Sequence, residues 1–266
     1  MLQVRFLATI SLLLTGLLAA HAAPQTSSNV GREKSWADQI VDSVVVGEPV
    51  WLERRQHKFL ALYAPPATGA VSRGVILIHG RGVHPAWGFI DNLRADLADA
   101  GYHTLSLQMP ILEPGASFGA YGKTFPEAFE RIDAGIQYLK KHGVQRVILL
   151  GHSTGAMNAV AYPTKRPQAP VAGIVAIGLS TLANGPDIMQ PALMLKTVRV
   201  PVLDLYGAND LHEVLSYTEA RRKAAREAGN KGYRAVREPG ANHFFTDQYE
   251  ALKKQTLDWL SRNAAK

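Results

Sequence analysis

The sequence contains no cysteine among its 266 residues. The protein therefore has no disulfide bond, no thiolate metal ligand and no cysteine to carry a lipid anchor. No second long apolar run follows the N-terminal one, so we expect no stable insertion into a membrane. The formal net charge is +7, but the basic residues are scattered and lack interleaved aromatics, so we expect no nucleic-acid partner. The densest basic group, Arg221, Arg222, Lys223 and Arg226, is expected to form a solvated helix face.

The first residues are typical of a secretory signal. Arg5 precedes the apolar run Phe6–Ala20, which is followed by His21 and Ala22. This run is shorter than the roughly 20 residues that cross a bilayer. We therefore expect residues 1–22 to be a signal peptide and the protein to be exported, either periplasmic or secreted. Polar turn formers follow, so we expect a flexible leader over residues 23–40 and a single domain over residues 41–266.

From about Val50, short apolar runs alternate with amphipathic stretches. The runs predict an antiparallel pair of strands at 50–54 and 57–63, followed by strands at 75–79, 102–107, 146–150, 171–177, 202–206 and 233–237. Helical patterns separate the later strands. This alternation predicts an α/β fold with a mostly parallel eight-stranded sheet and helices on both faces. Ligands bind beyond the carboxyl ends of such strands, so catalytic residues are expected in the strand-to-helix turns.

The segment Gly151-His152-Ser153-Thr154-Gly155 follows one predicted strand and precedes a helical pattern. A serine hydroxyl is a poor nucleophile unless it is exposed, next to a base and near donors that stabilise an oxyanion. A sharp strand-to-helix turn exposes the serine but strains its backbone, and it requires small residues two positions before and after. Gly151 and Gly155 meet that requirement. Ser153 is therefore a candidate nucleophile, and the N–H of Thr154 is expected to face the developing negative charge.

A carboxylate and an imidazole follow in the order that this chemistry requires. Asp210 lies in the turn after the predicted strand 202–206, and His243 lies just after the last predicted strand. An imidazole accepts the serine proton, and a carboxylate fixes the tautomer of the imidazole and stabilises its charged form. Asp210 and His243 are therefore the candidate partners of Ser153.

Three other residues compete for these roles. Asp204 lies inside its predicted strand, where a carboxylate is more often a structural hydrogen-bonding group. Asp187 is the nearest acid after the strand at 171–177, and it is a weak substitute. His212 lies two residues after Asp210, but nothing obvious would orient it. We therefore favour Asp210 and His243 over these alternatives.

With these motifs, the chain from about Val50 to Leu260 resembles the α/β-hydrolase superfamily. More narrowly, the segments His79–Trp87 and Leu105–Pro110 resemble those of a group of exported bacterial α/β-hydrolases. The superfamily resemblance implies an α/β-hydrolase fold, and the narrower one adds no substrate.

The superfamily resemblance also implies roles for two sets of residues. The catalytic set is Ser153 as nucleophile, His243 as general base and acid, and Asp210 as orienting carboxylate. The oxyanion hole is formed by the N–H of Thr154 and by an N–H of the turn after the first long parallel strand, at Arg81 or Gly82.

Some residues near the proposed site are candidate substrate contacts. Arg81 departs from the glycine-rich form of its turn in many lipases and esterases, so its guanidinium is a candidate ligand for a carboxylate or phosphate of the substrate. A salt bridge at the rim is the alternative for Arg81. His84 and His152 flank the site and are candidates too, although capping or surface roles are alternatives for both.

The segment Gly178–Arg199 is too short for a large lid domain and predicts one helix around Met189–Leu195. Met189 and Leu193 either line one wall of an open cleft or pack onto the sheet. No metal or other cofactor is expected. His212 and Glu213 begin like a zinc-protease helix, but the second histidine is missing, and no phosphate-binding or dinucleotide-binding glycine motif occurs.

These features predict a serine hydrolase that cleaves carboxylic esters through an acyl-enzyme intermediate. The partner is then a small-molecule or acyl substrate. The same groups also suit a thioesterase, an amidase or an acyltransferase. A non-catalytic binding module of the same fold is the alternative from another class. The sequence does not define the oligomeric state.

Overall fold

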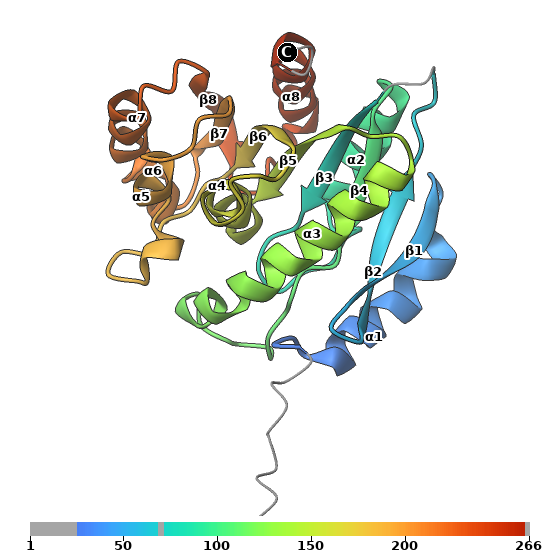
Figure 1. Cartoon of the computed structure of the whole chain (residues 1–266). Helices are drawn as coiled ribbons and strands as arrows, with labels where there is room; N and C mark the ends of the chain where they lie inside the picture. The colour runs from blue at the N-terminus through green and yellow to red at the C-terminus, as the bar shows by residue number, and fades with distance from the viewer. Residues whose placement is uncertain (1–25, 69–71, 264–266) are drawn as a thin grey trace, which may run out of the picture.

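The computed structural model describes residues 26–68 and 72–263, so the predicted signal peptide lies outside the described residues. The strands are Glu48–Arg54 (β1), His57–Ala64 (β2), Arg73–Ile78 (β3), His103–Leu107 (β4), Arg146–His152 (β5), Val171–Ile177 (β6), Val202–Asn209 (β7) and Tyr233–Asn242 (β8). They form one sheet in the order β1-β2-β4-β3-β5-β6-β7-β8 (Figure 1). β2 pairs antiparallel with β1 and β4, and the other neighbouring strands are parallel. The predicted mostly parallel eight-stranded sheet is confirmed.

Helices cover both faces of this sheet (Figure 1). They are Val30–Ile40 (α1), Phe89–Asp99 (α2), Phe125–Lys141 (α3), Thr154–Lys165 (α4), Pro191–Leu195 (α5), His212–Leu215 (α6), Thr218–Glu227 (α7) and Tyr249–Asn263 (α8). Short 3-10 helices span Val41–Ser43 (η1), Gly119–Thr124 (η2) and Asp187–Met189 (η3). α2 and α8 pack on one face, and α3 and α4 pack on the other. Among the described residues, no helix has the length and apolar character needed to cross a membrane.

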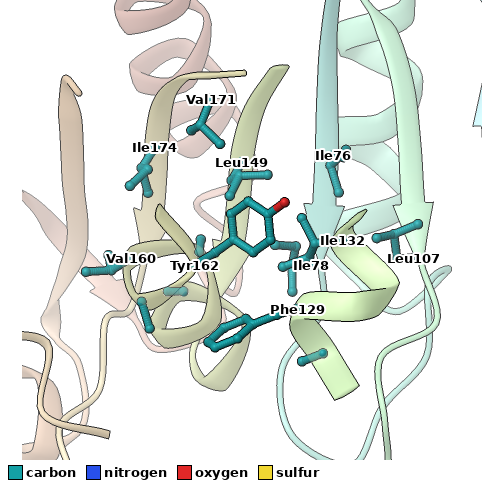
Figure 2. Packing of buried hydrophobic residues seen from close by; sticks show 14 of the residues in the cluster. Ile76, Ile78, Leu107, Phe129, Ile132, Leu149, Val160, Tyr162, Val171 and Ile174 are labelled. Carbon is teal, nitrogen blue, oxygen red and sulfur yellow. The ribbon is translucent and has the colours of Figure 1, made fainter. Parts of the chain in front are cut away.

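The face under α3 and α4 has a closely packed apolar core (Figure 2). Phe129 and Ile132 from α3 and Tyr162 from α4 lie against Ile76 and Leu149 from the central strands β3 and β5. All five side chains are buried, and each such burial stabilises the fold by about 1.5–3 kcal/mol. Because a slip of one residue would turn the strand side chains to the other face of the sheet, this packing fixes the strand register. Strands β3 to β8 run parallel, so their carboxyl ends meet at one edge of the sheet.

The predicted flexible leader over residues 23–40 is wrong from Val30 onward, because α1 occupies Val30–Ile40. The side chain of Asn29 caps this helix by accepting a hydrogen bond from the N–H of Arg32 at 2.9 Å. Ala37 and Ile40 of α1 pack with buried leucines of β2. The apolar stripe of α1 is narrow, so composition indicated a leader where tertiary packing forms a helix.

The expectation that the basic group of α7 is a solvated face is wrong for Arg221, which is 0% exposed. Its Nε donates to Oδ2 of the buried Asp204 at 2.7 Å, and its Nη1 donates to the carbonyl of Val214 at 3.0 Å. The partner of Arg221 lies on another element, so helical periodicity did not reveal that this cation faces inward. The same pair gives Asp204 the structural role that was expected of it.

The connection from β6 to β7 contains η3 and the five-residue helix α5, and no large lid domain. Pro191 occupies the first turn of α5, so this helix begins after Met189 rather than at it. Met189 is 0% exposed and belongs to the core beneath the sheet. Of the two placements left open for this residue, the structure shows packing and no cleft wall.

Candidate active site

Ser153 lies at the sharp turn between β5 and α4, with φ 55° and ψ −118°. This conformation is strained for a residue other than glycine. The flanking glycines are required by close backbone contacts: a Cβ on Gly151 would lie 2.3 Å from the carbonyl oxygen of Gly155, and one on Gly155 would lie 2.1 Å from that of Ile78. The N–H of Ser153 donates to the carbonyl of Ile177 at 2.9 Å. Neighbouring strands therefore hold the serine in this turn.

Asp210 and His243, 33 positions apart in the sequence, are in contact. Nδ1 of His243 lies 2.6 Å from Oδ1 of Asp210, and both residues are buried. The carboxylate also accepts hydrogen bonds from the N–H of Leu211 at 2.7 Å and of Gly207 at 3.2 Å. Because a carboxylate only accepts, Nδ1 carries the proton, and Nε2 of the neutral ring keeps its lone pair. That tautomer allows Nε2 to accept a proton.

Two glycines allow close contacts beside the Asp210–His243 pair. Sequence reasoning missed both of them. Gly178, at the end of β6, has φ 56°, and a Cβ there would lie 2.9 Å from Cε1 and Nδ1 of His243. A Cβ on Gly207 would lie 2.2 Å from the carbonyl oxygen of Ala241. A glycine at the carboxyl end of a predicted parallel strand is the signal that points to such contacts.

His152 connects the turn that carries Ser153 to the loop that carries His243. Its Nε2 donates to the backbone carbonyl of His243 at 3.0 Å, and its ring is stacked on Trp87 at 5.8 Å between centroids. Burial, together with the nearby His243, lowers the pKa of His152 to about 3. His152 borders the pocket described below, but it is only 2% exposed. Its observed contacts position other residues.

His79 holds the turn His79–Gly82, at the predicted oxyanion hole. Its Nδ1 donates to the carbonyl of Gly80 at 2.8 Å, and its Nε2 accepts from the N–H of Met109 at 2.9 Å. Burial lowers the pKa of His79 to about 3, and the hydrogen bond to Gly80 offsets only part of this effect. A Cβ on Gly80 would lie 3.4 Å from Cβ of Ser153, so the turn lies directly against the serine. Sequence reasoning gave His79 no role.

A pocket of about 140 Å³ brings the predicted groups together. Its lining residues are Gly80, Arg81, Val83, Trp87, His152, Ser153, Leu211, His243 and Phe244. Leu211 and Phe244 are large apolar side chains that are 46% and 49% exposed at this pocket. Two larger hollows, of about 370 and 380 Å³, lie along α3, but neither is lined by a serine or a histidine. The pocket that Ser153 and His243 line is therefore small and partly apolar.

The structure also places the remaining candidates. Thr154 begins α4, and Arg81 is exposed, with its guanidinium 5.8 Å from the ring of Phe118. His84 packs against Trp36 and does not line the pocket. Leu193 does not line it either.

The rival residues have other partners or positions. Asp204 is paired with Arg221, Asp187 lies in η3, and His212 forms a hydrogen bond with Ser216 at 3.1 Å. Among the described residues, no cluster of three or more histidines, cysteines and acids could hold a metal ion.

Solved structures define the class of fold. Est1E from Butyrivibrio proteoclasticus is 16% identical, with a TM-score of 0.66, and the match covers 82% of this chain and 99% of that chain. A putative dienelactone hydrolase from Klebsiella pneumoniae is 17% identical, with a TM-score of 0.68 and the same coverage. An α/β serine hydrolase without lid from Xanthomonas campestris is 14% identical, with a TM-score of 0.58, over 82% of this chain and 95% of that chain. The chain has the α/β-hydrolase fold.

The family model described as "Protein of unknown function (DUF3530)" matches residues 5–120 and 119–261. The chain therefore belongs to this family. A search of the curated proteins finds no match to the sequence.

Two of the buried histidines, His79 and His152, make stability depend on pH. His79 and His152 have folded pKa values of about 3, below the ordinary 6.5, so the unfolded chain binds their protons first. Stability from this source is present above pH 6.5 and is lost as the pH falls towards 3, by about 1.4 kcal/mol per pH unit for each histidine. Urea unfolding between pH 4 and pH 7.5 measures this slope. His152→Gln should lower this slope by the contribution of one histidine, about 1.4 kcal/mol per pH unit. An unchanged slope would contradict the lowered pKa of His152.

Proposed function

We propose that the protein is a serine hydrolase in which Ser153, His243 and Asp210 form a catalytic triad. The observation that carries the proposal is the 2.6 Å contact between His243 and Asp210 in the pocket that contains the strained Ser153. Strained backbone that the surrounding structure holds in place is concentrated at functional sites. The order serine, acid, histidine along the chain is that of α/β-hydrolases.

In the proposed reaction, Nε2 of His243 accepts the Ser153 proton while Oγ attacks the carbonyl carbon of the substrate. Asp210 holds the imidazole in the required tautomer and stabilises its charged form. The N–H of Thr154 and an N–H of the turn at Arg81 or Gly82 stabilise the oxyanion. His243 then protonates the leaving group, and a water activated by the same imidazole hydrolyses the acyl-enzyme.

The substrates that we propose are carboxylic esters with short acyl groups. The pocket of about 140 Å³ is below the roughly 300–1,000 Å³ of drug-sized ligand sites. Leu211 and Phe244 add an apolar surface beside it. The neighbour described as a putative dienelactone hydrolase supports ester chemistry, because a lactone is a cyclic ester. Thioesters, amides and acyl transfer to an alcohol use the same groups and are the alternatives.

We also propose that the protein acts outside the cytoplasm, in the periplasm or after secretion. The support is the charged start, apolar run and small-residue exit within residues 1–22. Cell fractionation of the full chain, with a variant that lacks the apolar run as control, tests this location.

Labelling with a fluorophosphonate tests the triad. The probe should modify Ser153 in the wild-type protein, and Ser153→Ala should abolish the adduct. His243→Ala should slow the labelling by about 10³–10⁴-fold, because the hydroxyl then has no base. His212→Ala is the matched control and should label at the wild-type rate. Loss of labelling in His212→Ala but not in His243→Ala would refute the assignment, and an unlabelled wild type would favour a binding module.

The small pocket predicts a dependence on acyl length. With p-nitrophenyl esters, kcat/KM should be highest from acetate to butyrate and about tenfold lower for octanoate, because the longer chain does not fit. Ser153→Ala corrects for background hydrolysis. A value of kcat/KM that rises steadily with chain length would contradict a small acyl site.

The position of Arg81 predicts a preference for anionic substrates. Arg81 lines the pocket, and within the described part of the chain its guanidinium makes one long hydrogen bond, 3.5 Å from Nη1 to the carbonyl of Ala116. Arg81→Ala should raise KM by about three- to tenfold for mono-p-nitrophenyl succinate, because a charge-assisted contact is lost. The neutral butyrate ester is the matched control. An equal rise in KM for both esters would show that Arg81 does not bind an anionic group.

A further inference from the structure

An N-terminal strap, defined here as residues 26–33, lies along the loop that follows β4. The N–H of Asn29 donates to the carbonyl of Ile111 at 2.7 Å, and the N–H of Ile111 donates to Oγ of Ser28 at 2.8 Å. Nη1 of Arg32 donates to the carbonyl of Leu112. Three successive contacts therefore fix the path of residues 111 and 112.

This loop contacts the turn His79–Gly82, which we call the oxyanion turn because it carries one of the predicted oxyanion donors. Two residues before Ile111, the N–H of Met109 donates to His79, which in turn donates to the carbonyl of Gly80. Arg32 also approaches the turn directly, because its Nη2 lies 3.5 Å from the carbonyl oxygen of Gly82. One guanidinium thus joins the loop after β4 to the turn after β3.

The strap is itself anchored by buried charges. Glu127 of α3 accepts hydrogen bonds from the hydroxyls of Thr26 and Ser27, each at 2.7 Å. Arg131 of α3, which is 0% exposed, bridges Glu127 at 2.7 Å and Glu33 of the strap at 2.8 Å. Burial raises the pKa of Glu127, but Arg131 and the bonds from Ser27 and Thr26 outweigh it and lower the pKa to about 2. Glu127 is thus charged near neutral pH.

Arg131 extends this anchor to the loop, because its Nη1 donates to the carbonyl of Gln108 at 2.8 Å. The strap, the loop after β4 and α3 are therefore joined through one buried ionic cluster. Such a cluster holds a fixed geometry, because separating its members would leave a buried charge unpaired.

We propose that the N-terminal strap is a positioning element of the oxyanion turn and that Arg32 is its positioning residue. The inference rests on the proposed function, since the turn holds an oxyanion only if Ser153 attacks a carbonyl group. Donors to an oxyanion act because they are held in place before charge develops. A strap that fixes the turn therefore stabilises the transition state more than the bound substrate.

Steady-state kinetics of the full chain with p-nitrophenyl acetate test this role. Arg32→Ala should lower kcat by about tenfold with KM within about twofold, because small displacements of catalytic groups are costly. Arg32→Lys should recover part of kcat, since an ammonium group can reach one of the two carbonyls. Lys34→Ala is the matched control, because Lys34 lies on the same helix and pairs with Asp38 on the surface. This control should match the wild type.

A second measurement separates positioning from stability. A trifluoromethyl ketone of matched size forms an oxyanion adduct with a serine hydrolase, so its binding should weaken in parallel with kcat/KM in Arg32→Ala. If Arg32→Ala does not fold, Ser28→Ala removes the hydroxyl that contacts the N–H and carbonyl of Ile111 and the carboxylate of Glu33, and it should show the same fall in kcat at constant KM.

Two results would overturn the role of the strap: a folded Arg32→Ala with the kcat of Lys34→Ala, or a loss confined to KM. If the wild type itself neither hydrolyses esters nor reacts with a fluorophosphonate at Ser153, the proposed function fails instead. The two failures are therefore distinguishable in one set of assays.

Discussion

The candidate site depends on how closely the backbone segments at the carboxyl edge of the sheet approach each other. The turn bearing Ser153 is possible because Gly151 and Gly155 leave room for neighbouring carbonyls. The contact between Asp210 and His243 needs the ends of β7 and β8 close together, and Gly207 allows this. Side chains at these glycines would separate the segments that carry Ser153, Asp210 and His243. Backbone packing therefore sets the geometry of the site.

Polar contacts hold the three histidine rings of the site in defined tautomers. Asp210 keeps the proton of His243 on Nδ1, and Met109 keeps that of His79 on Nδ1 as well. His152 donates from Nε2 to the loop that carries His243. Burial keeps His79 and His152 uncharged near neutral pH, so these two rings act as fixed hydrogen-bonding groups. In the proposed mechanism, His243 is the imidazole that carries a proton between serine and leaving group.

The sequence predicted the eight strands and the grouping of Ser153, Asp210 and His243, because apolar periodicity and turn glycines are local signals. Features that depend on partners distant in sequence were not predictable in this way. The strap is held by Glu127 of the distant helix α3. The buried Arg221 pairs with a carboxylate of β7. The contacts of His79 with Met109 and of Gly178 with His243 join segments that are far apart in the sequence.

The central claim is that Ser153 carries the acyl group and that His243 transfers its proton. Acid-quenched intact-mass spectrometry during turnover of p-nitrophenyl acetate, followed by peptide mapping, tests it most directly. The account predicts an acetyl group on Ser153 in the wild type and none in His243→Ala over the same interval. Turnover by the wild type without acylation of Ser153, or acylation at another residue, would contradict it.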